Sequence, residues 1–329
     1  MKAFDVSEMK FVKKGKVKEV YLTADGNYCF VFTDSISVFD QVIPTKIEGK
    51  GETLNRCSAH WFKEAEKMGI LTHYIGRPAP NQMLVKRAGS FPMKGPHEPD
   101  YGWANTSKAN YQIPLEVISR HNIVGSMYDR LLDGRVKPEE LGFPAGTDPK
   151  SIKKGAKLPE PFVEVTTKFE KRDKPLPVDE ALRIAGIMPV EYNEMKEIVL
   201  QLDEEMARQV ESRGLIHFDG KKEFALNEHR ELMLIDTFGT GDEDRFVLKK
   251  EFEEKGKIVE ISKEYVRQYY RKIGHHEELE RIRAMNDKRK EAREEPLPEP
   301  EIPPLPEADA AETSRIYKQL AEMITGEGT

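Results

Sequence analysis

Two neighbouring apolar segments, the first of which carries charged residues at alternating positions, constrain the fold of this chain more than any other feature. GLIHFDGKKEFAL (214–226) and ELMLID (231–236) have the composition of neighbouring strands. Along the first of them Asp219, Lys221 and Glu223 alternate, so all three side chains leave the same face. The pattern predicts a sheet with one buried surface and one charged surface.

The pairing of these strands would bring a further carboxylate onto the charged face. A turn centred on 228–229 pairs Lys221 with Asp236 and Glu223 with Leu234, so Asp236 would lie diagonally from Glu223. Hard carboxylate oxygens suit Mg²⁺, which keeps several waters and takes further ligands from phosphate groups. The alternative is a cross-strand ion pair of Lys221 with the acids, worth at most about 1 kcal/mol if exposed. The residues alone leave both interpretations open.

The other segments predict a mixed α+β protein with antiparallel strands toward the N-terminus. Strands are expected at 17–23 and 28–34, around the turn signal Asp25-Gly26, and at 70–75, 82–88 and 113–120. Helices are expected at 54–68, at 191–213, after Ser262, at 276–294 and at about 313–324. Irregular structure is expected at 89–110, at 136–161, in the Pro-bounded, Thr-rich segment 159–170 and in a polyproline-like strap at 296–308.

Composition excludes several classes of function. The formal net charge of -6 argues against a general nucleic-acid or membrane-surface binder, and no apolar run reaches the roughly 20 residues of a membrane helix. Two cysteines without metal-type spacing favour a reducing, cytoplasmic location. No GxSxG, CxxC or HExxH is present, so hydrolase, redox and zinc-protease functions have no support.

Two further groups could bind anions, although each also has a simpler interpretation. Lys16 and Lys18 would leave the same face of a strand and could cover the phosphates of a nucleotide, but a solvated lysine-rich strand end is favoured on this motif alone. Arg120, followed by Ser126 in a Gly-Ser turn, could hold a phosphate or carboxylate. His73 is favoured as a structural histidine over a ligand or base.

Eight segments, taken in order, resemble the SAICAR synthetases, the phosphoribosylaminoimidazole-succinocarboxamide synthases of purine biosynthesis. They span most of the chain: GKVKEVY, FTDSISVFDQVIPTKIEGKG, LEVISRHNIVGS, LPEPFVEVTTKFEKRD, GLIHFDGKKEFAL, LIDTFGTGDEDRF, ISKEYVRQYY and IYKQLAEMITGE. Any one match is modest, but eight in the correct order are specific.

The resemblance implies a two-lobed α+β fold, related to kinases and ATP-grasp enzymes, with ATP in the cleft between the lobes. The expected parts are a nucleotide-covering β-rich lobe at 1–88, an inserted loop at 89–111, an α+β lobe binding substrate and ATP at 112–275, a charged helix with the Pro-rich strap at 276–311, and a helix at 312–329 packing on the second lobe. The implied reaction joins L-aspartate to the carboxylate of the carboxylated aminoimidazole ribonucleotide (CAIR), giving SAICAR, ADP and phosphate through an acyl phosphate.

The resemblance also implies roles for individual residues of this chain. Lys16, Lys18 and Lys86 would contact ATP, Glu223 and Asp236 would bind Mg²⁺, and Lys221 with Asp219 and Asp236 would serve catalysis. Substrate binding would fall to Ser37, Asp40, Arg120, Ser126, Arg245 and Arg267.

Two departures from the family pattern keep alternatives open. Thr237 stands where the family has a glutamate, and TGDEDR (240–245) replaces TPDSSR, which adds acids where hydroxyls are usual. A paralogous ligase with another amine or ribotide, or a catalytically silent nucleotide-binding protein, therefore stays beside the ligase as an interpretation. The expected partners are small molecules, with no nucleic acid and no membrane, and a homodimer is left open.

Overall fold

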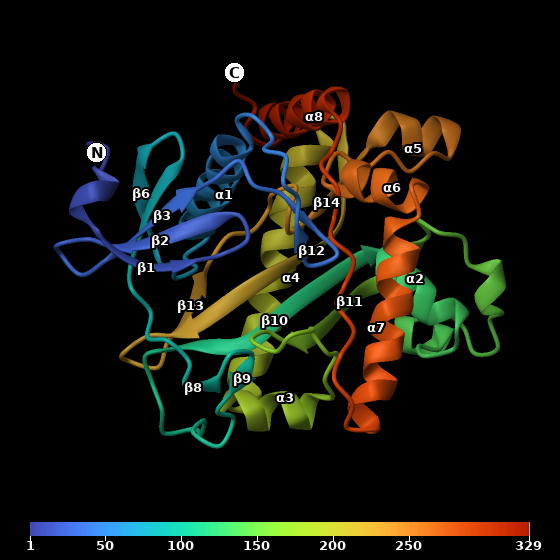
Figure 1. Cartoon of the computed structure of the whole chain (residues 1–329), viewed down its shortest axis with the longest axis horizontal. Coiled ribbons are helices and arrows are strands. Elements are labelled where there is room, and N and C mark those ends of the chain that lie inside the picture. Colours follow the sequence, from blue (N-terminus) through green and yellow to red (C-terminus); the bar gives the residue numbers. More distant parts are fainter. Residues whose placement is uncertain (329) are drawn as a thin grey trace.

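Five antiparallel strands near the N-terminus form the first main sheet of the computed structural model, which describes residues 1–328 (Figure 1). Their order across the sheet is β1 (Lys10–Lys14), β2 (Lys18–Leu22), β3 (Tyr28–Phe32), β7 (Gln82–Val85) and β6 (Tyr74–Ala79). The helix α1 (Lys50–Lys67) packs on this sheet through buried residues that include Trp61 and Phe62. The hairpin predicted around Asp25-Gly26 is confirmed as β2 and β3.

A second antiparallel sheet crosses the centre of the molecule. Its strand order is β11 (Lys157–Thr167), β10 (Tyr111–Asn122), β12 (Leu215–Leu226) and β13 (Leu232–Ile235), and β14 (Arg245–Leu248) pairs with the other half of β12. Because β13 and β14 share one edge of β12, the segment 236–244 leaves the sheet between them and lies beside the middle of β12. The long helix α4 (Pro189–Glu211) covers one face of β10 and β12, as the pattern at 191–213 predicts.

Two expectations for this sheet are wrong. The register pairs Glu223 with Ile235, one residue away from the predicted Leu234, because five residues, and not four, connect Leu226 to Leu232. The segment 159–170 is not a loop over most of its length, since 157–167 form β11. Its prolines are tolerated because β11 is an edge strand.

Short elements and loops connect the two sheets. The small hairpins are β4 (Ser37–Val38) with β5 (Gln41–Val42) and β8 (Met93–Gly95) with β9 (Glu98–Pro99), and the short helices are α2 (Gly125–Leu132) and α3 (Val178–Ala185). Single 3₁₀ turns lie at Val6–Glu8, Pro138–Leu141 and Pro149–Ser151. The segment 89–110 is ordered, because Phe91 packs against Tyr101, Trp103 and Tyr111.

The C-terminal part wraps both sheets. It comprises α5 (Lys249–Lys255), α6 (Glu264–Lys272), α7 (His275–Glu291), the Pro-rich strap without regular structure, and α8 (Glu307–Thr325). Figure 1 shows the strap running back beside α7 to reach α8. The helix α8 lies against α1 and also contacts α4 and α6, so it bridges the two lobes and does not pack on the second lobe alone. None of the helices within residues 1–328 is long and apolar enough to span a membrane.

Candidate active site

A cleft between the two sheets is lined mainly by charged side chains. Its larger part has a volume of about 980 Å³ and is lined by ten Lys and Arg residues against seven Asp and Glu residues, although the whole chain carries a net charge of -6. A smaller part of about 100 Å³ is lined by apolar side chains of β1–β3 and β13, with three lysines, His73 and Asp236 also in its lining. The larger part therefore suits anionic ligands and the smaller part suits a flat, apolar group.

The thirteen side chains singled out by the sequence gather along this cleft. Nine line the larger part: Lys16, Ser37, Asp40, Arg120, Ser126, Asp219, Lys221, Arg245 and Arg267. Lys18, Lys86 and Asp236 line the smaller part. Glu223 accepts a hydrogen bond of 3.3 Å from Gln112, whose side chain borders both parts.

Two carboxylates at the junction are each paired with a lysine. Lys18 contacts Asp236, and Lys168 contacts Glu223, which is 4% exposed. Burial lowers the pKa of Lys18 to about 7, although the nearby Glu223 carboxylate opposes that change. Burial alone would raise the pKa of Glu223, but Lys168 and Lys221 outweigh it and hold that pKa below its usual value. The Glu223 carboxylate is therefore ionised beside these lysines.

Asp236 ends β13 in a left-handed backbone conformation. Its φ of 65° takes it out of the strand, so it reaches Lys18 by a bend and not by the predicted alternation. His73 Nε2 lies 3.2 Å from the carbonyl oxygen of Asp236 and is buried, which agrees with the structural interpretation of this histidine. Burial lowers the pKa of His73 to about 3, so the ring is neutral and can donate to that carbonyl.

Lys221 projects from β12 into the larger part of the cleft. Its Nζ lies 2.7 Å from Glu116 Oε1 and 3.9 Å from Glu223 Oε1. Burial would lower the pKa of Lys221, but Glu116, Glu223 and Glu243 reverse the shift and raise that pKa above its ordinary value. Lys221 is therefore a permanent cation in this cleft.

A second group of charges lies further along the same wall. Arg120 of β10 and Arg245 of β14 both contact Asp219 of β12, because the three residues are opposite one another in the register of the sheet. Gly125 has a φ of 54°, and a Cβ at this position would lie 2.6 Å from Arg245 Nη2. Only glycine lets Arg245 approach the start of α2, where Ser126 lines the cleft.

The three consecutive acids of the loop 236–244 have three different surroundings. Asp242 accepts from Lys50 Nζ at 2.8 Å and from the Tyr317 hydroxyl at 2.6 Å. Asp244 is 3% exposed and accepts from the Gly239 N–H at 2.7 Å. Glu243, bound by the Thr240 hydroxyl, has no cation within ion-pair distance among the described residues and lines the cleft. Only Glu243 is therefore a new acid available to a ligand.

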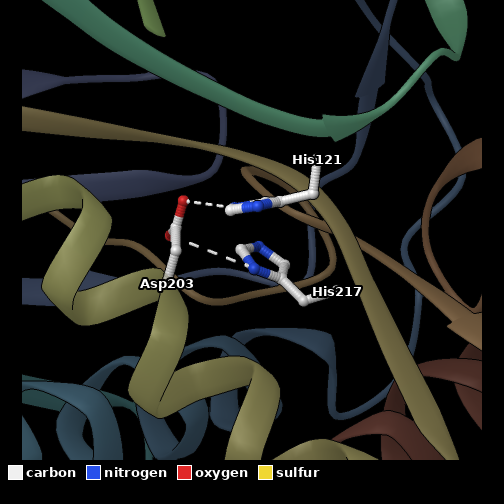
Figure 2. A group of neighbouring side chains, drawn as sticks. All are labelled: His121, Asp203 and His217. Carbon is white, nitrogen blue, oxygen red and sulfur yellow. Dashed lines mark hydrogen bonds and ion pairs between the residues drawn. The ribbon is translucent and has the colours of Figure 1, made fainter. Parts of the chain in front are cut away.

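His121, Asp203 and His217 form a group with the composition of a metal site (Figure 2). His121 Nε2 lies 2.9 Å from Asp203 Oδ2, while the buried ammonium of Lys222 contacts Asp203 and lies 3.3 Å from Asp244. Because Lys222 already supplies the positive charge, this group is an internal ion-pair network. It joins α4 to the face of β12 opposite the cleft.

Sequence reasoning missed several residues of the cleft. Glu116 pairs with Lys221, and Lys168, directly after β11, pairs with Glu223. The pairings of β10 with β11 and β12 that bring these residues there are not visible in the sequence. Lys263 lines the cleft next to Arg267, and burial lowers its pKa to about 8. The motif ISKEYVR contains Lys263 and was the available signal for it.

Comparisons with known proteins identify the family of this chain. The family model described as SAICAR synthetase matches residues 11–282. Curated proteins named phosphoribosylaminoimidazole-succinocarboxamide synthase are similar to this chain in Thermoplasma acidophilum, with 47% identity over 97% of this chain and 99% of the relative, and in Thermoplasma volcanium, with 42% identity over 97% and 99%.

Solved structures show the same fold at lower identity. A SAICAR synthetase (type 2) in complex with ADP is 22% identical, with a TM-score of 0.63 over 97% of this chain and 99% of that chain. The SAICAR synthase of Saccharomyces cerevisiae complexed with SAICAR is 20% identical, with a TM-score of 0.69 over 98% and 96%.

Proposed function

The chain belongs to the SAICAR synthetase family, and from this premise we propose that it joins L-aspartate to CAIR at the expense of ATP. The products are SAICAR, ADP and phosphate. A carboxylate is a poor electrophile, so the γ-phosphoryl group of ATP is first transferred to the CAIR carboxylate, with loss of ADP. The amine of aspartate then attacks the acyl phosphate, the C–O bond to phosphate breaks, and the amine loses a proton.

The smaller part of the cleft receives the adenine of ATP in this proposal. Val20, Phe30 and Ile235 supply apolar walls, and Lys18 and Lys86 border the same space. The phosphates then extend past Lys18 and Lys16 toward the larger part. A phosphate near Lys18 would raise its pKa and so favour its charged form, because an anion stabilises a neighbouring ammonium.

The carboxylates of Glu223 and Asp236 fit Mg²⁺. They are hard oxygen donors at the junction of the two parts, next to the space proposed for the phosphates, and Mg²⁺ would replace the lysine that now contacts each of them. When bound there, Mg²⁺ would neutralise charge on the phosphates of ATP. The Thr237 hydroxyl lies 3.3 Å from Asp236 Oδ1 and helps to orient this carboxylate.

The larger part holds the ribotide and the amino acid. Arg245 and Ser126, at the start of α2, suit the ribotide phosphate, since guanidinium and hydroxyl donors recognise phosphate oxygens. Lys221 faces the junction, where the CAIR carboxylate meets the γ-phosphate, and its fixed charge stabilises the transferring phosphoryl group. Catalysis here is positioning and charge neutralisation, so no covalent nucleophile is needed.

The observation that carries this proposal is the convergence of Lys18, Lys221, Glu223 and Asp236 at one junction of an anion-binding cleft. We place the reaction in the cytoplasm, because Cys29 and Cys57 are buried and unpaired, as suits a reducing compartment.

Omission assays test the proposed function. The purified protein is incubated with ATP, Mg²⁺, CAIR and aspartate, each left out in turn, while ADP and SAICAR are measured. We expect equal amounts of ADP and SAICAR, and no SAICAR when any substrate is missing. ADP formation that never depends on CAIR would refute the proposal, and CAIR-dependent turnover with an amine other than aspartate would support the paralogous ligase instead.

A further inference from the structure

The hairpin of β4 and β5 presents a strained turn to the cleft. Ser37, Phe39 and Asp40 all line the larger part, and Asp40 Oδ1 lies 2.6 Å from Lys16 Nζ. The two turn residues between the paired strands, Phe39 and Asp40, have φ values of 52° and 66°. A two-residue turn of this kind strongly prefers Asn-Gly, and a phenylalanine at positive φ is unfavourable. The sequence Phe39-Asp40 therefore does not stabilise this turn by itself.

Residues far away in the sequence stabilise it instead. Arg283 of α7 donates from Nη2 to the carbonyl oxygen of Phe39 at 2.8 Å. The Phe39 ring lies 4.1 Å, centroid to centroid, from the ring of His276, and the guanidinium carbon of Arg271 lies 5.6 Å from the Phe39 centroid. The strained turn is thus held by α6 and α7 through both its backbone and its side chain.

The Pro-rich strap completes this support. Glu299 accepts from Arg283 Nε at 3.2 Å, which fixes the guanidinium in its orientation toward Phe39. Gln41 Nε2 donates to the carbonyl oxygen of Pro300 at 2.7 Å, and Gln41 Oε1 lies 2.8 Å from His275 Nε2. At the far end, Thr45 exchanges two hydrogen bonds with the backbone of Leu305. The strap therefore borders the hairpin along its length, which a simple linker would not do.

We infer that Arg283, oriented by Glu299 of the strap, is a positioning residue that holds the Phe39–Asp40 turn in the conformation required for ribotide binding. The inference rests on the proposed function only in naming the ribotide as the ligand of this wall. Among the lysines proposed for ATP, only Lys16 touches this hairpin, through its pair with Asp40. Loss of Arg283 should therefore weaken the binding of CAIR more than the binding of ATP.

Steady-state kinetics of Arg283→Ala test the inference. We expect the KM for CAIR to rise about tenfold, since small displacements of a binding wall cost this much or more, while the KM for ATP stays within about twofold. Arg283→Lys keeps one donor and should recover part of the loss. The matched control is Arg281→Ala on the same helix, because Arg281 is exposed and pairs with Glu278 only at the surface.

Two further measurements keep the test decisive. Glu299→Gln perturbs the orientation of Arg283 without removing its side chain, so the KM for CAIR should rise less than in Arg283→Ala. This variant still tests the inference if Arg283→Ala does not fold. Amide hydrogen exchange at 37–42 should be faster in Arg283→Ala than in Arg281→Ala, and this readout holds even if the protein proves inactive with CAIR. An unchanged KM for CAIR in Arg283→Ala, or equal exchange at 37–42 in both variants, would overturn the inference.

Discussion

At the scale of single residues, Asp236 combines an unusual backbone with a proposed role in binding Mg²⁺. Asparagine has nearly the same size and tolerates positive φ, so Asp236→Asn removes the charge and little else. We expect kcat to fall about a hundredfold or more, because one of the two carboxylates proposed for Mg²⁺ is lost. The thermal midpoint should be unchanged, and Glu228→Gln in the exposed connection of β12 to β13 serves as control. Near-normal turnover of Asp236→Asn would exclude this carboxylate as a ligand.

His73 offers a test of how the bend at Asp236 is held. His73→Phe keeps the aromatic packing against Phe62 and Phe30 but removes the donor to the Asp236 carbonyl. A hydrogen bond of this type contributes about 1 kcal/mol, so kcat/KM should fall about fivefold. His73→Gln can still donate and should lose less. Because His73 is neutral throughout the neutral range, the ratio of the variants should not vary with pH there, and a ratio that did vary would contradict its assignment as a neutral donor.

Glu243 is the acid of the loop 236–244 that lines the cleft without a cation partner among the described residues. ATP and CAIR are anions, so among the substrates only the ammonium group of aspartate gains from a carboxylate at this position. Glu243→Gln should raise the KM for aspartate several-fold and leave the KM values for ATP and CAIR unchanged or lower. Initial-rate kinetics with each substrate varied in turn measure this, and a selective rise for CAIR would point to a different role.

At the scale of elements, β12 organises the site, and its sequence revealed only part of that role. The alternation of Asp219, Lys221 and Glu223 predicts their common face, because strand periodicity is a local property. The predicted register of β12 with β13 is wrong by one residue, because the register depends on the length of the connection at 227–231. The partners from β10 and β11 depend on pairing across distant segments, so Glu116 and Lys168 could not be predicted.

The ion-pair network beneath β12 predicts a large effect on stability. Asp203 is fully buried against Lys222, so Asp203→Asn leaves an ammonium with one weaker partner and should lower the free energy of unfolding by about 3 kcal/mol. Urea unfolding at pH 7 measures this, with the exposed Glu204→Gln on the same helix as control. A decrease in the free energy of unfolding of less than about 1 kcal/mol would contradict this, because it would show that Asp244 alone compensates the buried charge of Lys222.

The pH dependence of this effect follows from the pKa of Asp203. Burial would raise that pKa, but Lys222, His217 and His121 outweigh it and hold the pKa well below its ordinary value of 3.8. A carboxylate with a depressed folded-state pKa stabilises the protein fully above 3.8 and loses this contribution as the pH falls further. The difference between the native protein and Asp203→Asn should therefore still be present at pH 5 and shrink below pH 4.

At the scale of the whole molecule, the cleft exists because the chain crosses between the lobes several times. His73 N–H donates to the Leu234 carbonyl, and Leu234 N–H donates to the Leu71 carbonyl, so the segment 71–73 joins the second sheet before β6 begins in the first. This explains why the strand expected at 70–75 lies at 74–79. The order of the sequence motifs predicted the family and the residues that line the cleft. The contacts of α7 and the strap with the β4–β5 hairpin could not be predicted, because they join residues that are far apart in the sequence.

The fate of the CAIR carboxylate oxygens tests the central claim most directly. CAIR labelled with ¹⁸O in this carboxylate is converted with ATP and aspartate, and the phosphate and SAICAR are analysed by mass spectrometry. The acyl-phosphate route predicts that each turnover transfers one labelled oxygen to phosphate and leaves the other in the new amide. Phosphate without label, formed together with SAICAR, would contradict phosphoryl transfer to the carboxylate and with it the assignment of this cleft.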